Sequence, residues 1–260
     1  MTRVLLGTVA IEPNRWGTIR SDQSPTTRVH EHLAAIAAAG FDGIELWEGH
    51  LTPDLADQAR AAGVPLEIFN SYVGFDDGDD GARLSVAANV AATGARAVKI
   101  NVGNDPAAEL AYAERLGRFV EALPDGSAAL CECHRGISIA EDPVVAARIL
   151  TAAGPRAHAL VHTHDDDAQL RACFDAYGDR ISHVHVNLLD FATLTHPRLE
   201  QVVDRLGSTV ETIRSQGFDG SWTIEFVAGL LTDLDEPVGL VDQASRDLVV
   251  LRSILDKDPT

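Results

Sequence analysis

The chain has 260 residues, of which 45% are hydrophobic and 23% charged, and its formal net charge is -18. This size and composition suit an ordinary globular protein that can bury a sizeable core. The excess of acidic residues argues against a nucleic-acid partner and against docking on an anionic membrane, because both interactions need a basic protein surface.

Short apolar runs alternate with helical stretches from one end of the chain to the other. The predicted strands are 3–9, 43–47, 65–69, 96–102, 128–134, 158–163, 180–186 and 221–226. The predicted helices lie near 27–39, 53–62, 82–93, 106–121, 141–152, 166–176, 197–215 and 237–256. Such alternation indicates a parallel sheet, and eight units in this length are typical of a (β/α)8 TIM barrel, here a single domain over residues 1–260. An open doubly wound sheet would need a glycine-rich phosphate turn after the first strand, and the segment 7–13 contains none.

The cysteines and the N-terminal segment point to the cytoplasm. The chain has three cysteines, and an odd, low number is typical of proteins in a reducing compartment. Cys131 and Cys133 flank Glu132 in a predicted strand, so we expect both to face outward and to pack against helices. Residues 1–7 have no signal-peptide core, and no apolar run is long enough to span a membrane.

Polar side chains gather at the ends of the predicted strands. In a barrel of this type the active groups point inward from the C-terminal ends of the strands. That rule selects Glu45, Trp47, Lys99, Asn101, Glu132, His134, His162, His164, His183, His185, Asn187 and Glu225. Burying so many polar groups is costly unless they are paired or bind a metal ion. Because carboxylate and imidazole groups end four consecutive strands, the sequence predicts a divalent metal site.

These motifs resemble the xylose isomerase-like barrels that are called sugar phosphate isomerase/epimerases. The resemblance rests on Gly-Phe-Asp-Gly-Ile-Glu-Leu-Trp at 40–47, Glu-Cys-His-Arg-Gly at 132–136, His162-Thr163, His183-Val-His185 and the strand that carries Glu225. That family includes hydroxypyruvate isomerases, ketose 3-epimerases and inosose dehydratases. The likeness extends over nearly the whole chain. It implies a carbohydrate as the small-molecule substrate and, because relatives are often oligomers, a homodimer or homotetramer.

The resemblance implies a metal-ligand set of Glu132, His162, His185 and Glu225. The family usually has Asp where His162 stands, and His164 and Asp165 are rival candidates for this ligand. Two imidazole ligands favour Mn or Co over Mg, with Zn, Fe and Ni as further candidates. The resemblance also implies that Glu132 and Glu225 act as the acid/base pair on either side of the reacting carbon.

Lys99 is a further catalytic candidate, because an inward lysine is costly unless it is used and burial lowers its pKa. It could act as a second base, an oxyanion stabiliser or a counter-ion for Glu45, and the alternative is a buried ion pair. The expected substrate contacts are His134, His164, Glu45, Trp47, Asn101, Arg135, Trp16 and His196. His134 and His164 could instead support the metal ligands.

The leading functional hypothesis is a metal-dependent isomerase or epimerase of a keto sugar, sugar acid or related polyol. A dehydratase or lyase would use the same metal and carboxylate pair, since both reactions begin by removing a proton next to a chelated carbonyl. An apurinic-site endonuclease shares the barrel, but the net charge of -18 argues against it. A non-catalytic sugar-binding subunit would be expected to have lost Glu132 or Glu225, and both are present.

Overall fold

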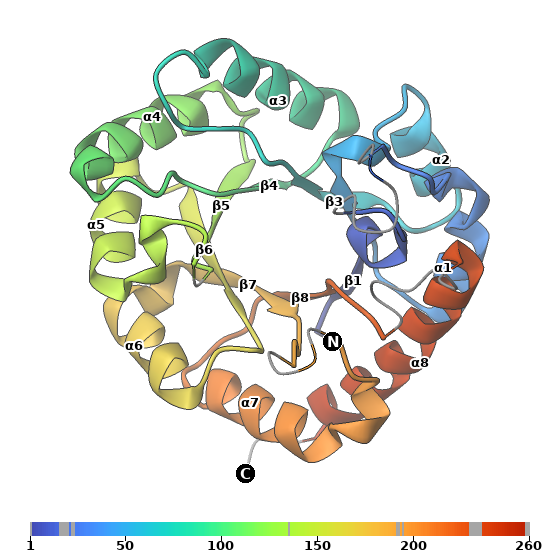
Figure 1. Cartoon of the computed structure of the whole chain (residues 1–260). Helices are drawn as coiled ribbons and strands as arrows, with labels where there is room; N and C mark the ends of the chain where they lie inside the picture. Colours follow the sequence, from blue (N-terminus) through green and yellow to red (C-terminus); the bar gives the residue numbers. More distant parts are fainter. Residues whose placement is uncertain are drawn as a thin grey trace.

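The structure is a computed structural model that describes residues 2–15, 21, 24–134, 136–190, 193, 195–228 and 236–257. Within these residues, the strands form a closed barrel in the order β1 to β8, and every neighbouring pair is parallel, including β8 with β1 (Figure 1). The strands are β1 (Val4–Gly7), β2 (Ile44–Trp47), β3 (Leu66–Asn70), β4 (Ala97–Ile100), β5 (Ala128–Glu132), β6 (Ala157–His162), β7 (Ile181–Val186) and β8 (Ser221–Ile224). The predicted (β/α)8 TIM barrel is confirmed.

A ring of α-helices surrounds the barrel. They are α1 (Leu33–Ala39), α2 (Leu55–Ala61), α3 (Asp80–Thr93), α4 (Glu109–Ala122), α5 (Pro143–Ala153), α6 (Asp167–Tyr177), α7 (Val203–Ser215) and α8 (Pro237–Leu255). Short 3₁₀ turns occupy several loops: η1 (Thr8–Ile11), η2 (Val29–Glu31), η3 (Glu48–His50), η4 (Pro106–Ala108), η5 (Ile139–Glu141), η6 (Gly178–Arg180) and η7 (Leu199–Gln201).

Several elements are shorter than predicted because loop residues use their polar groups elsewhere. The helix expected from residue 27 begins only at Leu33, since Thr27 donates its backbone N–H to Glu12 and its hydroxyl to the carbonyl of Ile11. The first strand ends at Gly7, and the next residue, Thr8, accepts a hydrogen bond from the backbone N–H of Trp47. These contacts tie the loop after β1 to the end of β2.

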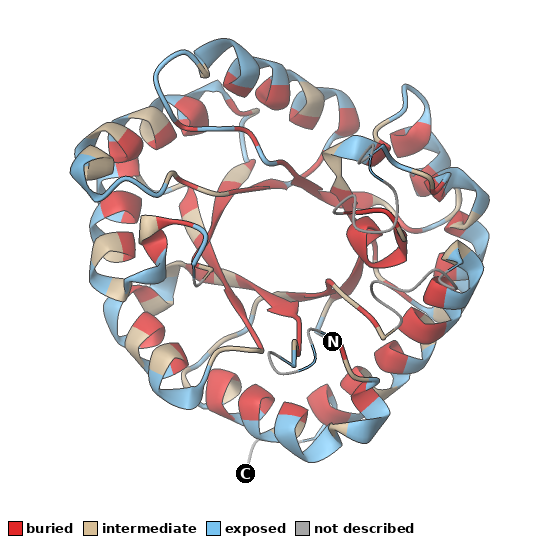
Figure 2. Cartoon of the chain, viewed as in Figure 1, coloured by how far each residue is buried: buried red, intermediate tan, exposed pale blue. Residues whose placement is uncertain are grey.

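The strands and the barrel-facing sides of the helices are buried (Figure 2). Their hydrophobic side chains form an outer layer between strands and helices and a small plug inside the barrel. The plug consists of Leu5, Ile68, Ala97, Leu130 and Leu160. Cys131 and Cys133 belong to the outer layer and are free thiols, as their alternation with Glu132 predicts. Since side chains alternate along a strand, the next inward position after each plug residue lies nearer the C-terminal mouth of the barrel.

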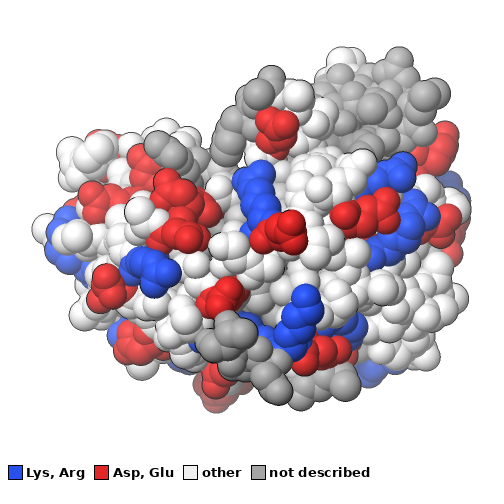
Figure 3. Space-filling model, turned by 90° about the horizontal axis from the view of Figure 1, so that it is seen from below, with Lys and Arg blue, Asp and Glu red and all other residues white. Residues whose placement is uncertain are grey.

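Charged side chains of both signs share the surface. On the side seen in Figure 3, Lys and Arg lie among Asp and Glu and form no continuous basic patch in the part that is described. Among the described residues, no helix has the length and apolar character needed to cross a membrane.

Candidate metal centre

A layer of polar side chains lies directly above the apolar plug. Asn70, Lys99, Glu132 and His162 each follow a plug residue of the same strand by two positions and therefore point into the barrel. Side chains from β2, β7 and the end of β8 complete the layer. The sequence alternation thus places the polar groups of separate strands in one buried space at the C-terminal mouth.

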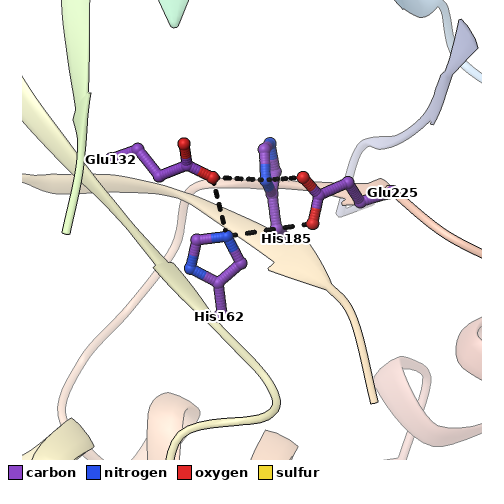
Figure 4. Close-up of side chains that lie close together, drawn as sticks. All are labelled: Glu132, His162, His185 and Glu225. Carbon is purple, nitrogen blue, oxygen red and sulfur yellow. Dashed lines mark hydrogen bonds and ion pairs between the residues drawn. The ribbon is translucent and has the colours of Figure 1, made fainter. Parts of the chain in front are cut away.

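Glu132, His162, His185 and Glu225 converge at the centre of this layer (Figure 4). Each offers one ligand atom, and these atoms all lie within 4.8 Å of one another. His162 Nε2 is 3.0 Å from Glu132 Oε1 and 3.8 Å from Glu225 Oε2. His185 Nδ1 is 3.2 Å from Glu225 Oε1 and 3.9 Å from Glu132 Oε1. All four residues are buried, so two carboxylates face each other in a space nearly closed to water.

Glu132 presents one oxygen to the cluster and has the other held from behind. Lys99 Nζ lies 2.5 Å from Glu132 Oε2, and Asn101 Nδ2 donates to the same oxygen at 2.8 Å. Asn101, expected as a substrate contact, therefore positions Glu132 through its amide nitrogen. These two donors fix the carboxylate so that Oε1 faces His162.

Lys99 forms a buried ion pair, and its pKa shift is opposite to the one expected from burial alone. Its ammonium pairs with Glu132 and not with Glu45, since β4 and β5 are neighbours in the barrel. Burial lowers the pKa of Lys99, but the charges of Glu132 and of the neighbouring Tyr72 raise it more, so the pKa lies above its ordinary value. Lys99 therefore stays protonated at neutral pH, and a protonated lysine cannot act as the second base that was one of its expected roles.

Glu45 fixes the orientation of His185. Glu45 is buried, with 1% of the residue exposed. Its carboxylate accepts a hydrogen bond from Asn70 at 2.7 Å and lies 3.0 Å from His185 Nε2. With Nε2 donating to Glu45, the lone pair of His185 Nδ1 faces Glu132 and Glu225. Glu45 was expected to contact the substrate. In the structure its two oxygens instead contact Asn70 and His185, on the side of His185 that faces away from the cluster.

His183 lies one inward position deeper in β7 than His185. Its Nδ1 is 2.8 Å from Ser221 Oγ and its Nε2 is 2.8 Å from Thr223 Oγ1. Both ring nitrogens thus have hydroxyl partners inside the barrel. His183 therefore lies in a layer beneath the cluster and supports it.

Glu225 follows β8 and is held by Asn187, which follows β7. Asn187 Nδ2 donates to Glu225 Oε2 at 3.0 Å, and the backbone of Asn187 is fixed in turn by the hydroxyl of Thr163 at 2.9 Å. Asn187 was among the inward residues selected from the sequence, but no role was assigned to it. The sequence indicates this residue because Asn187 is polar and lies two positions after His185, on the same face of the strand.

The electrostatics of the cluster keep both of its carboxylates ionised. Burial raises the pKa of Glu132, but Lys99 and His162 lower it more, and the pKa lies well below its ordinary value. Burial likewise raises the pKa of Glu225, while His185 and His162 lower it to about 2. Burial lowers the pKa of His185, but Glu225 and Glu45 raise it well above its ordinary value. A proton and a metal ion would therefore compete for His185 Nδ1, and metal binding would release that proton.

His162, not His164, reaches the cluster. Strand β6 ends at His162, and the chain turns immediately afterwards. The His164 ring stacks on the His162 ring with centroids 4.8 Å apart, and the His134 ring lies edge-on to both at 4.7 and 4.9 Å. Asp165 lies outside the cluster, with Oδ1 3.7 Å from His164 Nε2. His134, which follows β5, and His164, which follows β6, thus line the same side of the cluster.

Loop residues complete the mouth above Glu225. The guanidinium of Arg15 lies over the Phe226 ring at 5.3 Å, and the His196 ring packs against Phe226 at 4.8 Å. Burial and the charge of Arg15 lower the pKa of His196 to about 4, so this imidazole is neutral at pH 7. The expected contacts Trp16 and Arg135 lie outside the described residues.

Tyr72 on the opposite side of the mouth was not selected from the sequence. Its ring covers the ammonium of Lys99 at 4.3 Å while 41% of the residue stays exposed. Glu48 holds the segment by accepting hydrogen bonds from Ser71 Oγ at 2.6 Å and from the backbone N–H of Tyr72 at 2.7 Å. Trp47, an expected substrate contact, is partly buried and packs edge-on to His50 at 5.0 Å.

The donor set of the four-residue cluster fits a divalent metal ion. It combines two ionised carboxylates with two imidazoles, and its two negative charges would balance one divalent ion. His185 Nδ1 is buried and has no hydrogen-bond partner among the described residues, although its other nitrogen is fixed on Glu45. Such a mixed nitrogen and oxygen set suits transition ions better than magnesium. Glu132, His162, His185 and Glu225 can therefore hold the ion that the sequence predicts.

Known structures share the barrel at low sequence identity. A protein named IolI, solved with a bound zinc atom, matches with a TM-score of 0.68 at 12% identity, covering 99% of this chain and 100% of its own. Endonuclease IV from Thermus thermophilus matches with a TM-score of 0.63 at 15% identity, covering 88% and 95%. A sugar phosphate isomerase/epimerase from Parabacteroides distasonis matches with a TM-score of 0.60 at 10% identity, covering 96% and 98%.

These matches extend over nearly the whole of each chain. They show that this chain shares its barrel fold with these proteins. No protein-family model matches the sequence, and a search of curated proteins finds no match. The activity therefore has to be argued from the side chains of this chain.

Proposed function

We propose that this protein is a divalent-metal-dependent isomerase or epimerase that acts on a keto sugar, a sugar acid or a related polyol. The observation that carries the proposal is the cluster of Glu132, His162, His185 and Glu225, whose ligand atoms lie within 4.8 Å of one another at the mouth of the barrel. The likeness of the fold to IolI and to a sugar phosphate isomerase/epimerase supports it.

In the proposed reaction, Glu132 and Glu225 move the proton. A bound divalent ion would supply Lewis acidity, which makes the C–H bond next to a chelated carbonyl more acidic. Glu132 reaches the cluster from β5 and Glu225 from the end of β8, so they approach from different strands and can serve opposite faces of one carbon. Their lowered pKa values keep both carboxylates ionised at neutral pH, which is the form that binds a metal ion.

In this proposal the surrounding residues hold Glu132 and Glu225 in orientation and do not contact the reacting carbon. Lys99 and Asn101 fix Glu132, Asn187 fixes Glu225, and Glu45 fixes His185. Hydrogen bonds of this kind hold ligands in the orientation that a metal site requires. The aromatic ring of Tyr72 and the imidazoles of His134 and His164 offer walls on which a sugar would lie.

Mn²⁺ or Co²⁺ is the ion we propose, because two of the ligands are imidazoles. Zinc, iron and nickel suit the same donors, and IolI was solved with zinc. Metal analysis of protein purified without added metal tests this point. Magnesium alone, or no metal at all, would contradict a transition-metal site.

A screen of keto sugars, inososes and 3-keto glycosides with metal-loaded protein in deuterated water tests the reaction. We expect deuterium to enter the carbon next to the carbonyl, with a product of unchanged composition. Glu225→Gln should lower the exchange rate by about 10² or more, since general base catalysis contributes about 10² to 10⁴. Glu114→Gln, on the exposed face of α4, is the matched control. Full activity in Glu225→Gln would refute the acid/base role.

A dehydratase or lyase reaction is the second candidate, because it begins with the same proton removal at the same cluster. Product mass separates the two candidates: loss of water or of an aglycone identifies a lyase, and an unchanged mass identifies an isomerase or epimerase. Endonuclease IV shares the fold, but the net charge of -18 makes a DNA substrate the weaker candidate.

A further inference from the structure

Three asparagines at the barrel mouth share one arrangement. In each, the amide nitrogen donates to a buried carboxylate: Asn70 to Glu45 at 2.7 Å, Asn101 to Glu132 at 2.8 Å, and Asn187 to Glu225 at 3.0 Å. These carboxylates are ionised and can only accept, so each contact identifies the nitrogen of the amide. The three carbonyl oxygens are buried, and none of them has a hydrogen-bond partner among the described residues. The mouth thus holds three acceptors for which the described chain supplies no donor.

Asn101 and Asn187 lie nearer the mouth than Asn70 does. Asn70 pairs in register with Lys99, whereas Asn101 follows Lys99 by two positions and is the first residue after β4. Asn187 likewise follows His185 by two positions and is the first residue after β7. Because β5 and β6 lie between β4 and β7, the two amides flank the metal cluster on two sides.

The nitrogens of these two amides hold the carboxylates of the proposed acid/base pair. The ligand atoms of Glu132 and Glu225 lie within 4.8 Å of each other, and each carboxylate has one of the amides beside it. A carbonyl compound chelated at the cluster would therefore bring the groups on its neighbouring carbons to Asn101 and Asn187.

A carbonyl oxygen selects for hydroxyl groups and against anions. It accepts a hydrogen bond and cannot donate one, so a hydroxyl group satisfies it, whereas an ionised carboxylate or phosphate does not. A buried acceptor that loses water without gaining a donor is costly. An anionic group would also meet the like charges of Glu132 and Glu225.

Lys99 and Arg15 carry positive charge at the mouth, but both are engaged within the described chain. Lys99 pairs with Glu132. Arg15 is 3% exposed, donates Nη1 to the carbonyl of Glu12 at 2.7 Å, and lies over the Phe226 ring. These contacts leave the selection by the amide oxygens in force.

We infer that the carbonyl oxygens of Asn101 and Asn187 accept hydrogen bonds from two hydroxyl groups of the substrate, and that the substrate is a neutral polyhydroxylated ketone and not a sugar acid or a sugar phosphate. The inference rests on the proposed function for the position of the chelated carbonyl. It narrows that proposal to one substrate class and gives each amide two roles, one for its nitrogen and one for its oxygen.

Calorimetric binding to the metal-loaded wild-type protein tests the substrate class without requiring turnover. The neutral probes are D-psicose, D-fructose, D-sorbose and D-tagatose, each compared with its terminal carboxylic acid and its 6-phosphate. We expect at least one neutral ketose to bind about tenfold or more tightly than both of its anionic analogues, because the anion offers no donor to the buried acceptors. Equal binding throughout, tighter binding of the anions, or failure of every neutral ketose to bind would overturn the inference.

Deoxy and deoxyfluoro derivatives of the ketose that binds most tightly test the two contacts. Fluorine fills the position of the hydroxyl group but cannot donate, so we expect two positions at which either replacement weakens binding to the wild type about tenfold. In Asn101→Ala one of these losses should shrink to within about twofold, and in Asn187→Ala the other should do so. Asn104→Ala, which removes an exposed asparagine of the same loop as Asn101, should change neither loss.

A purely positioning role of the amides would weaken the binding of every derivative by one factor and leave both losses in place, which would overturn the contacts. Each variant is titrated at a Mn²⁺ concentration that saturates it, because it also lacks a donor to a metal-binding carboxylate. The wild-type comparison depends on neither variant. If neutral ketoses bind with this hydroxyl dependence but take up no deuterium, the proposed reaction fails while the contacts stand. If deuterium enters sugar acids alone, the contacts fail while the proposed reaction stands.

Discussion

Replacing Lys99 by methionine probes the ion pair on which the orientation of Glu132 depends. Lys99 Nζ and Glu132 Oε2 are 2.5 Å apart, and the two side chains are 1% and 3% exposed. At an effective dielectric constant of about 20, two unit charges at this distance attract by roughly 6 to 7 kcal/mol. Burial of both ions offsets part of that attraction, but in Lys99→Met the cost for Glu132 remains. We therefore expect the metal-free protein to lose about 3 to 5 kcal/mol of its free energy of unfolding.

Metal should reduce this loss, because a divalent ion at the cluster compensates the charge of Glu132. Urea unfolding with chelator and with Mn²⁺ measures the two states, and deuterium exchange into substrate measures turnover. We expect turnover to fall by about 10² or more, since Glu132 loses its shortest contact. Lys257→Met is a matched control, because Lys257 is the other lysine of the chain and is exposed. Near-normal turnover would show that Lys99 is only structural, and an unchanged free energy of unfolding would refute the ion-pair argument.

Three further substitutions test other parts of the structure. His162→Asp replaces an imidazole by a carboxylate, and competitive metal titration should show affinity for Mg²⁺ rising about tenfold or more relative to Zn²⁺. Glu45→Gln removes the negative charge that faces His185 Nε2, and the same titration should show metal affinity falling about 10- to 100-fold. Burial raises the pKa of Asp247 from its ordinary 3.8 to about 6, so the folded state binds this proton more tightly and loses stability as pH rises from 4 to 6. Asp247→Asn should therefore be about 2 to 3 kcal/mol more stable than the wild type at pH 7.5 and no more stable at pH 4, as measured by urea unfolding.

The barrel and the cluster residues on strands were predictable because they depend on local periodicity. Alternation along β5 puts Leu130 and Glu132 inside and Cys131 outside, and the sequence alone shows this order. The same rule was less reliable past the ends of the strands. It places His162 and His164 on one face, but β6 ends at His162, and the turn that follows directs His164 to the side of the cluster.

Contacts across the barrel were not predictable from periodicity. Glu45 and His185 are 140 residues apart in the chain, and they meet because the closed barrel brings the ends of β2 and β7 together. Lys99 pairs with Glu132 and not with Glu45, one of the three roles that its inward position suggested, because Glu132 lies on the adjacent strand, whereas Glu45 lies two strands away. Tyr72 was missed because its position depends on the hydrogen bonds of Glu48 with a loop, which strand patterns do not describe.

The supports behind the metal cluster are unequal. Glu132, His185 and Glu225 each have a second polar group that holds them, whereas Nδ1 of His162 is buried with no hydrogen-bond partner among the described residues. A change at any of the first three positions would leave a charged or polar neighbour buried in the barrel without its partner. A change at position 162 would remove the contact of His162 Nε2 with Glu132 Oε1, but Lys99 and Asn101 would still hold the other oxygen of Glu132. Strand β6 is therefore where an evolving or engineered barrel can exchange one ligand type for another at the smallest structural cost.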